Sequence, residues 1–246
     1  MKVIYIPTGR ALEYSPLACN LYTGCTHACK YCFAPGVSRT DKVTFHSKVI
    51  PRLDIINKIE IDCKKMENDP REILLCFMCD PYPEDSEITR QALEIFEKYN
   101  MKVQILTKGG LRAMRDFDLL KVNDWGFGTS MVFYTDTTRK LWEPNAASLK
   151  DRIEAIEIAN DMGIRTWISI EPIIDIEESL KLLRHIKRTY LVSHVKIGKL
   201  NHMYHKDKSK NWKYLVEEAE RILDDSDISY YIKKDTWEAA GRIWTN

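Results

Sequence analysis

The sequence predicts an α/β fold, a partial (β/α)6 barrel of the TIM type with parallel strands. Short apolar or β-rich runs alternate with amphipathic stretches about six times along the chain, a pattern typical of βα units around a parallel sheet. Right-handed crossovers between such units curl the sheet toward a barrel. A complete eight-fold barrel needs about 250 residues for eight units, and this chain of 246 residues carries fewer units. A doubly wound sheet is the structural alternative.

Six segments have the composition of buried strands, because apolar and β-branched residues dominate them and turn residues separate them. They are residues 19–23, 72–78, 103–107, 126–133, 165–171 and 190–197. The carboxyl ends of parallel strands share one edge of a sheet, so we expect the reactive site at that edge.

The stretches between these strands carry helix start signals. Side-chain acceptors precede three of the helical stretches, at residues 85–86, 148–151 and 175–178, and the second of these has the form of a capping box. Two consecutive glycines, 109–110, open a helix that extends to about Val122, and apolar spacing marks a final long helix over 212–223.

The bulk composition favours one domain over residues 1–246. No linker rich in Ser, Gly or Pro divides the chain. Its 37 basic and 36 acidic residues nearly cancel, so the protein has no strong net charge that would attract nucleic acid. The composition therefore neither supports nor excludes a nucleic-acid partner. No apolar stretch approaches the length of a membrane span. The seven cysteines are an odd number and no signal peptide is evident, so we expect a reduced, cytoplasmic protein.

Three cysteines are the most informative local pattern. Cys25, Cys29 and Cys32 have the spacing C-x3-C-x2-C in a loop over residues 24–36 that glycine and proline bracket. Such a loop can direct three thiolates at three irons of a 4Fe-4S cluster and leave the fourth iron without a protein ligand. An open iron is a place where a reactive cofactor binds.

A zinc site is the competing interpretation of the same cysteines. Tetrahedral zinc prefers four ligands, so Cys19 or His27 would have to supply the fourth. The chain would then be a non-catalytic module, with zinc or an iron-sulfur cluster fixing a loop for partner or nucleic-acid binding.

The cysteine loop, with the aromatic Tyr31 before its third cysteine, resembles the cluster loop of the radical S-adenosylmethionine (SAM) superfamily. The segments 79–84, 106–109 and 128–130 are similar to motifs of its spore photoproduct lyase-related group. This resemblance implies an enzyme with a 4Fe-4S cluster that cleaves SAM reductively. The products are methionine and a 5'-deoxyadenosyl radical, which abstracts a hydrogen atom from a substrate that the sequence leaves unidentified.

The resemblance also implies roles for individual residues around SAM. It places Lys108 at the SAM carboxylate and Ser130 near the ribose, while Tyr31 and Phe33 line the adenine. Asp80 stands where many members of the superfamily bind the methionine amine, although the usual Gly-Gly-Glu stretch is absent here; it could instead cap a turn before Pro81.

The chain departs from the lyase at the position of the hydrogen-atom donor. The lyase has a cysteine three positions before its aspartate, where this sequence has Phe77. Cys79, at a strand end, is the better-placed alternative donor, and Cys76 is expected to pack within its strand. We therefore do not infer from the lyase that this protein repairs a thymine lesion. Modification or repair of nucleic acid is one possible activity among several.

Further polar residues are expected at the mouth of the barrel. Glu171, at the end of the fifth strand, is a candidate for cofactor or substrate recognition. Lys196, Lys199 and Asn201 flank the sixth strand, and residues 201–213 mix cations with aromatics as in a phosphate-contacting loop or a solvated loop. The implied redox partner is an electron donor such as flavodoxin or ferredoxin.

Overall fold

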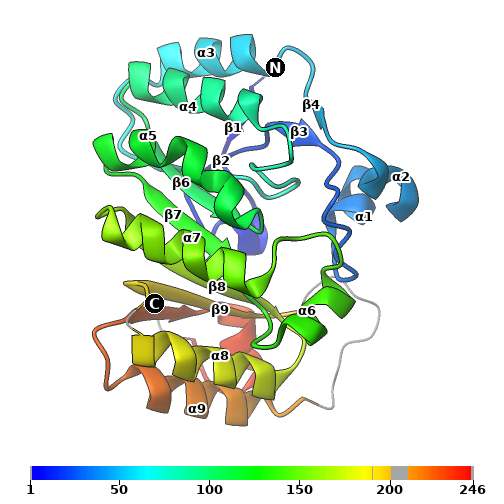
Figure 1. The fold of residues 1–246 in the computed structure, drawn as a ribbon, viewed down its shortest axis with the longest axis vertical. Coiled ribbons are helices and arrows are strands. Elements are labelled where there is room, and N and C mark those ends of the chain that lie inside the picture. The colour runs from blue at the N-terminus through cyan, green and yellow to red at the C-terminus, as the bar shows by residue number, and fades with distance from the viewer. Residues whose placement is uncertain (1, 190, 201–209, 245–246) are drawn as a thin grey trace.

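The computed structural model describes residues 2–189, 191–200 and 210–244. Its main feature is a curved sheet whose outer face is covered by helices (Figure 1). The strands are β1 (Ile4–Tyr5), β2 (Leu17–Cys19), β5 (Glu72–Leu75), β6 (Lys102–Thr107), β7 (Gly126–Ser130), β8 (Arg165–Ile173), β9 (His194–Lys199) and β10 (Ser229–Ile232). They form one sheet in that order. All neighbouring pairs are parallel except β1 with β2, so the parallel partial barrel is confirmed.

The helices follow the strands in the alternation that the sequence predicts. They are α1 (Ala34–Ser38), α2 (Lys42–Ser47), α3 (Ile55–Lys65), α4 (Glu87–Lys98), α5 (Phe117–Val122), α6 (Asp136–Trp142), α7 (Leu149–Asp161), α8 (Ile176–Thr189), α9 (Trp212–Leu223) and α10 (Lys234–Ala239), with the 3-10 helices η1 (Gly9–Ala11) and η2 (Gly110–Asp116). Ser148 caps α7 by accepting a hydrogen bond from the Asp151 amide at 3.1 Å, and α9 has the predicted bounds. The α1, α2 and α6 helices gather at one end of the sheet (Figure 1).

Two parts of the sheet differ from the prediction. The first strand ends at Cys19, and β3 (Tyr22–Thr23) instead pairs with β4 (Ile50–Pro51) in a separate two-stranded sheet. The chain leaves the main sheet at Asn20, whose Oδ1 accepts hydrogen bonds from the amides that follow β5. The other difference is at the two edges of the sheet, where β1 is antiparallel to β2 and β10 has the sequence Ser-Tyr-Tyr-Ile. Neither edge strand was predicted.

Side chains point alternately to the two sides of each strand, so the two faces of the sheet differ in composition. Residues such as Ile105, Phe127 and Ile168 have no exposed surface and pack in the core beneath the helices. The opposite, interior face carries polar groups in register, because Ser130 of β7 pairs with Ser169 of β8, which pairs with Lys196 of β9. Among the described residues, no helix has the length and apolarity needed to cross a membrane.

One close approach on the interior face yields a stability prediction. A Cβ atom at Gly128 would lie 2.2 Å from Cε2 of the Trp167 indole, so we expect Gly128→Ala to lower the free energy of unfolding by about 1–3 kcal/mol through overpacking. Gly36→Ala is the matched control, because a Cβ there meets no atom within 4 Å. Urea denaturation of both variants provides the test, and equal midpoints would contradict the packing argument.

Candidate functional site

The cysteine loop begins directly after β3, and its path requires a glycine. Gly24 has φ of +85°, and a Cβ there would lie 2.1 Å from the carbonyl oxygen of Lys48. The Cys25 amide then donates to the carbonyl of Phe45 at 3.2 Å, which ties the loop to α2. The loop conformation is therefore fixed at its entry by backbone contacts.

A second segment holds the middle of the loop from the other side. The Lys30 amide donates to the Trp142 carbonyl at 2.9 Å, and the Asn145 side chain donates to the Thr26 carbonyl at 3.0 Å. Asn145 also donates its amide to the His27 carbonyl at 3.3 Å. Backbone groups from the connection between α6 and α7 thus set the positions of the cysteines.

The three thiols of the loop are buried close enough to influence one another. Burial raises the pKa of Cys29 to about 12, and burial also raises the pKa values of Cys25 and Cys32. Among the described residues, no three Cys, His, Asp or Glu side chains converge as ligands of one metal ion. A cubane cluster has a different requirement, since each thiolate binds its own iron. The donor set fits such a cluster, which would be held by Cys25, Cys29 and Cys32.

Neither candidate fourth zinc ligand is available. Cys19 is fully buried within β2. Both nitrogens of the buried His27 ring have partners, because Nε2 lies 3.0 Å from Nη2 of Arg112 and Nδ1 lies 3.5 Å from Oδ2 of Asp80. These contacts give the His27 ring a role in packing the loop against the ends of β5 and β6.

Asp80 joins the ends of β5 and β6 and orients Lys108. Its Oδ1 accepts hydrogen bonds from the Tyr82 amide at 2.9 Å and the Thr107 hydroxyl at 2.6 Å, and its Oδ2 accepts from the Lys108 amide at 2.7 Å. Burial opposes ionisation, but His27 and these donors outweigh it and lower the pKa of Asp80. The turn before Pro81 is thus capped, and contact with a methionine amine stays a prediction.

Lys108 places a cation beside Tyr31 of the cysteine loop. Its Nζ lies 5.7 Å from the centre of the Tyr31 ring, and its charge lowers the pKa values of Cys29 and Cys32 against the effect of burial. Among the described residues, no carboxylate forms an ion pair with Lys108. A half-buried cation in that position suits an anionic group of a bound cofactor.

A buried ion pair contacts the cysteine loop through Tyr31. Glu143 and Arg152 are 0% and 1% exposed, and Nη2 of Arg152 lies 2.6 Å from Oε2 of Glu143. The other oxygen of Glu143 accepts a hydrogen bond from the Tyr31 hydroxyl. Arg152 also donates to the Ser130 carbonyl at 2.8 Å, so the cysteine loop, β7 and α7 meet at one pair of charges.

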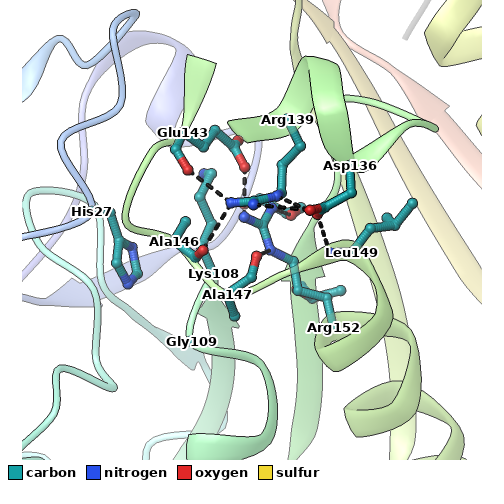
Figure 2. Close-up of polar contacts among 12 residues, drawn as sticks. His27, Lys108, Gly109, Asp136, Arg139, Glu143, Ala146, Ala147, Leu149 and Arg152 are labelled. Carbon is teal, nitrogen blue, oxygen red and sulfur yellow. Dashed lines mark hydrogen bonds and ion pairs between the residues drawn. The ribbon is translucent and has the colours of Figure 1, made fainter. Parts of the chain in front are cut away.

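The connection from α6 to α7 is closed by a second buried guanidinium. Arg139 donates at 2.9 Å to the carbonyls of Glu143 and Ala146 and at 2.6 Å to Asp136, whose carboxylate also accepts from the Leu149 amide at 3.1 Å. Figure 2 shows Arg139 extending from Asp136 toward Glu143 and Ala146. This connection is rigid because two arginines satisfy its carbonyls.

A separate polar group lies on the interior face of the barrel. Oε2 of Glu171 accepts from the Tyr14 hydroxyl at 2.5 Å, and its Oε1 lies 3.1 Å from Nζ of Lys233. Tyr14 also contacts the Ser169 hydroxyl at 2.7 Å. Glu171 therefore pairs with Lys233, and its role toward a cofactor or substrate stays a prediction.

The N-terminal segment completes this interior group. Nζ of Lys196 donates to the carbonyls of Glu13 and Tyr14 at 3.2 and 2.9 Å and lies 5.0 and 5.5 Å from the rings of Tyr14 and Trp167. Burial lowers the pKa of Lys196 to about 8. The Trp167 Nε1 is buried with no hydrogen-bond partner in the described part of the chain.

The structure brings together most, not all, of the predicted site residues. Asp80 and Lys108 contact the cysteine loop at His27 and Tyr31, and the Ser130 carbonyl accepts a hydrogen bond from Arg152 of the ion pair behind it. Phe33, 39% exposed, lies within the loop as the N-cap of α1. Asn201, His202 and His205, with most of the proposed phosphate-contacting loop, lie outside the described residues.

Several residues that organise the site have no recognisable signal in the sequence. Glu143, Arg152 and Tyr14 carry no motif and are remote in sequence from the residues they contact. A surface groove of about 500 Å³ also lies beside the loop at Thr26 and between Pro51 and Glu84, outside the barrel interior. It contains none of the predicted site residues.

Fold and site define a class of protein, a parallel partial barrel that presents three thiols beside a cation at its strand ends. The family model of the radical SAM superfamily matches residues 19–174, more than half of the 246 residues. The chain belongs to the radical SAM superfamily. As a member of this superfamily it has a 4Fe-4S cluster and SAM as its cofactors.

Two solved structures share the fold of this chain. Spore photoproduct lyase, complexed with dinucleoside spore photoproduct, matches with a TM-score of 0.72 and 14% identity over 93% of this chain and 80% of that chain. Streptococcus suis SuiB, bound to SAM, matches with a TM-score of 0.67 and 12% identity over 91% of this chain and 52% of that chain. These similarities show a shared fold, which confirms the predicted resemblance.

The curated relative is the uncharacterized protein MJ0683 of Methanocaldococcus jannaschii. It is 29% identical over 160 residues, which are 63% of this chain and 59% of that protein. The chain thus spans less than two thirds of MJ0683 and about half of SuiB.

The buried ion pair behind the loop predicts a large effect on stability. Arg152→Met leaves Glu143 charged and buried without its partner, so we expect a loss of about 3–5 kcal/mol in the free energy of unfolding. Arg71→Met is the control, because its partner Asp69 lies in a solvent-exposed pair worth at most about 1 kcal/mol. Guanidinium denaturation measures both, and similar losses would show that the buried pair has no special weight.

Proposed function

We propose that this protein cleaves SAM reductively and uses the resulting 5'-deoxyadenosyl radical to abstract a hydrogen atom from a substrate at the interior face of the barrel. The observation that carries the proposal is the location of three thiols and Lys108 at one edge of a parallel sheet. When bound there, the cluster supplies the electron that splits the SAM sulfonium.

The residues of this chain have distinct proposed tasks. Cys25, Cys29 and Cys32 hold the cluster, and Lys108 binds the SAM carboxylate as a partly desolvated cation. Tyr31 and Phe33 are proposed to flank the adenine and Ser130 the ribose. These positions are supported by the contact of His27 with Asp80 beyond β5, and by the contact of Tyr31 with Glu143, whose partner Arg152 donates to the carbonyl at the end of β7.

Other residues are proposed to act on the amine and on the substrate. Asp80 positions Lys108 and adds a carboxylate near the methionine amine. Glu171 lies on the interior face with Lys196 and Trp167, whose buried N–H groups suit a substrate that carries hydrogen-bond acceptors. We propose Cys79, half-buried in the connection that follows β5, as the hydrogen-atom donor. The strand predicted over 72–78 ends at Leu75, so Cys79 is not at the strand end itself.

Substrate and partners follow only in part from the similar proteins. The two solved relatives have different ligands. Spore photoproduct lyase is complexed with a dinucleoside spore photoproduct, and a second SuiB structure is bound to the precursor peptide SuiA. We propose nucleic acid and peptides as the substrate classes to examine first. The proposed reductant is flavodoxin or ferredoxin, and the proposed compartment is the cytoplasm, where an oxygen-sensitive cluster persists.

Removal of one cluster ligand tests the function. We expect the Cys29→Ala variant, after anaerobic reconstitution, to lose the visible absorption of the cluster and to form no 5'-deoxyadenosine with dithionite and SAM, because three thiolates are needed to hold the cubane. Cys63→Ala, a buried cysteine of α3, is the control that should retain both. Formation of 5'-deoxyadenosine at the wild-type rate by Cys29→Ala would overturn the assignment.

Removal of the Lys108 charge tests the SAM site. Loss of a charge-assisted hydrogen bond costs about 1.5–3 kcal/mol, so we expect Lys108→Met to weaken SAM binding by roughly 10- to 100-fold. Lys102→Met, on the exposed start of the same strand, should bind as the wild type does. Equilibrium dialysis of cluster-loaded enzyme with SAM gives the affinities, and equal values for both variants would exclude this role for Lys108.

A further inference from the structure

The C-x-x-C sequence from Cys76 to Cys79 is left unexplained by the cluster and SAM sites. It follows β5 directly and precedes α4, so it occupies a strand-to-helix connection at the reactive edge of the sheet. Two cysteines with this spacing in a βα unit are typical of dithiol redox sites.

A buried amide side chain shapes the turn between the two cysteines. Oδ1 of Asn20 accepts hydrogen bonds from the consecutive amides of Phe77 and Met78, at 2.9 and 2.8 Å. Asn20 is itself 6% exposed and donates to the Tyr5 hydroxyl at 2.7 Å. The two intervening residues are thus curled around one acceptor, with Cys76 and Cys79 on either side of them.

The two thiols differ in their access to solvent. Cys79 is half-buried, whereas Cys76 is 6% exposed and belongs to the core. This asymmetry matches a pair in which an accessible thiol meets the reagent and a shielded thiol resolves the product. Cys19 and Cys63 are fully buried and lie outside the turn.

We propose that Cys76 and Cys79 form a reversible intramolecular disulfide, a redox site that reacts with low-molecular-weight disulfides and is reset by dithiols. The Cys79 thiolate attacks one sulfur of the reagent and releases the first reagent thiol. Cys76 then attacks the Cys79 sulfur, the mixed disulfide breaks, and the second reagent thiol leaves. The reagent disulfide is reduced by two electrons, the cysteine pair is oxidised by two, and the two cysteine protons end on the released thiols.

The consequence for catalysis rests on the proposed function. A disulfide-bonded Cys79 has no S–H, so the oxidised pair cannot give a hydrogen atom to a substrate radical. The redox state of this pair would then decide whether the radical reaction is completed, while the cluster cysteines on their separate loop are untouched.

The test uses the full-length, cluster-loaded protein under argon with glutathione disulfide as the probe. After alkylation, trypsin releases residues 72–90, which contain Cys76 and Cys79 and no other cysteine. We expect this peptide to be two hydrogens lighter and unalkylated, and to become doubly alkylated when dithiothreitol precedes alkylation. Recovery of the peptide with both cysteines alkylated, or with glutathione on both, overturns the proposal.

Two variants test the order of attack. Cys76→Ser should retain glutathione on Cys79, because the resolving thiol is gone, and Cys79→Ser should leave Cys76 unmodified. Cys63→Ser is the control and should form the disulfide as the wild type does. Because the readout is peptide mass, it is independent of SAM cleavage: an unchanged peptide in an enzyme that still forms 5'-deoxyadenosine refutes the disulfide alone.

Discussion

The buried pair of Glu143 and Arg152 is the interaction on which the rest of the site depends. Two charges without exposed surface are costly to bury unless their hydrogen-bonding capacity is used. Here it is used, because Arg152 donates hydrogen bonds to carbonyls at the end of β7 and before α7, and Glu143 accepts one from the Tyr31 hydroxyl. Burial alone would raise the pKa of Glu143, but the Arg152 and Lys108 charges hold it below its usual value. The cysteine loop is thereby attached to the barrel through Tyr31.

A similar principle operates at the neighbouring strand ends. Asn20 and Asp80 each use a side-chain oxygen to accept backbone amides from another segment, so the ends of β2, β5 and β6 are joined without regular strand pairing. Both residues sit where a ladder of backbone hydrogen bonds stops and amides would otherwise lack partners. The proposed disulfide site and the orientation of Lys108 are two results of this arrangement.

The interior face shows why the barrel remains open and polar. Only β1 and β10 end the sheet, and the N-terminal segment lies across the interior with Tyr14 against Ser169, Glu171 and Lys196. The lysines there are stabilised by rings and carbonyls in place of bulk water. This group explains how the fold tolerates charges on the inside of a sheet, and it keeps hydrogen-bonding side chains beside the expected substrate position.

Local signals predicted the elements that depend on short-range chemistry. The C-x3-C-x2-C spacing, the capping box at Ser148 and the apolar spacing over Trp212–Leu223 each determine their structure within a few residues, so the cysteine loop, α7 and α9 were predictable. The parallel order of the sheet followed from the alternation of βα units. The edge strand β10 was not predictable, because its residues gain their pairing only from β9.

The sequence by itself thus determined the βα order and the superfamily resemblance, and the ligand set that it predicts stays a prediction. Tertiary structure alone decided which side chains meet: Tyr31 with Glu143, more than a hundred residues away, and Tyr14 with Glu171. The reason is physical, since spacing records neighbours along a helix, strand or loop, whereas partners for buried charges and hydroxyls are chosen when distant segments pack and must satisfy every buried polar group.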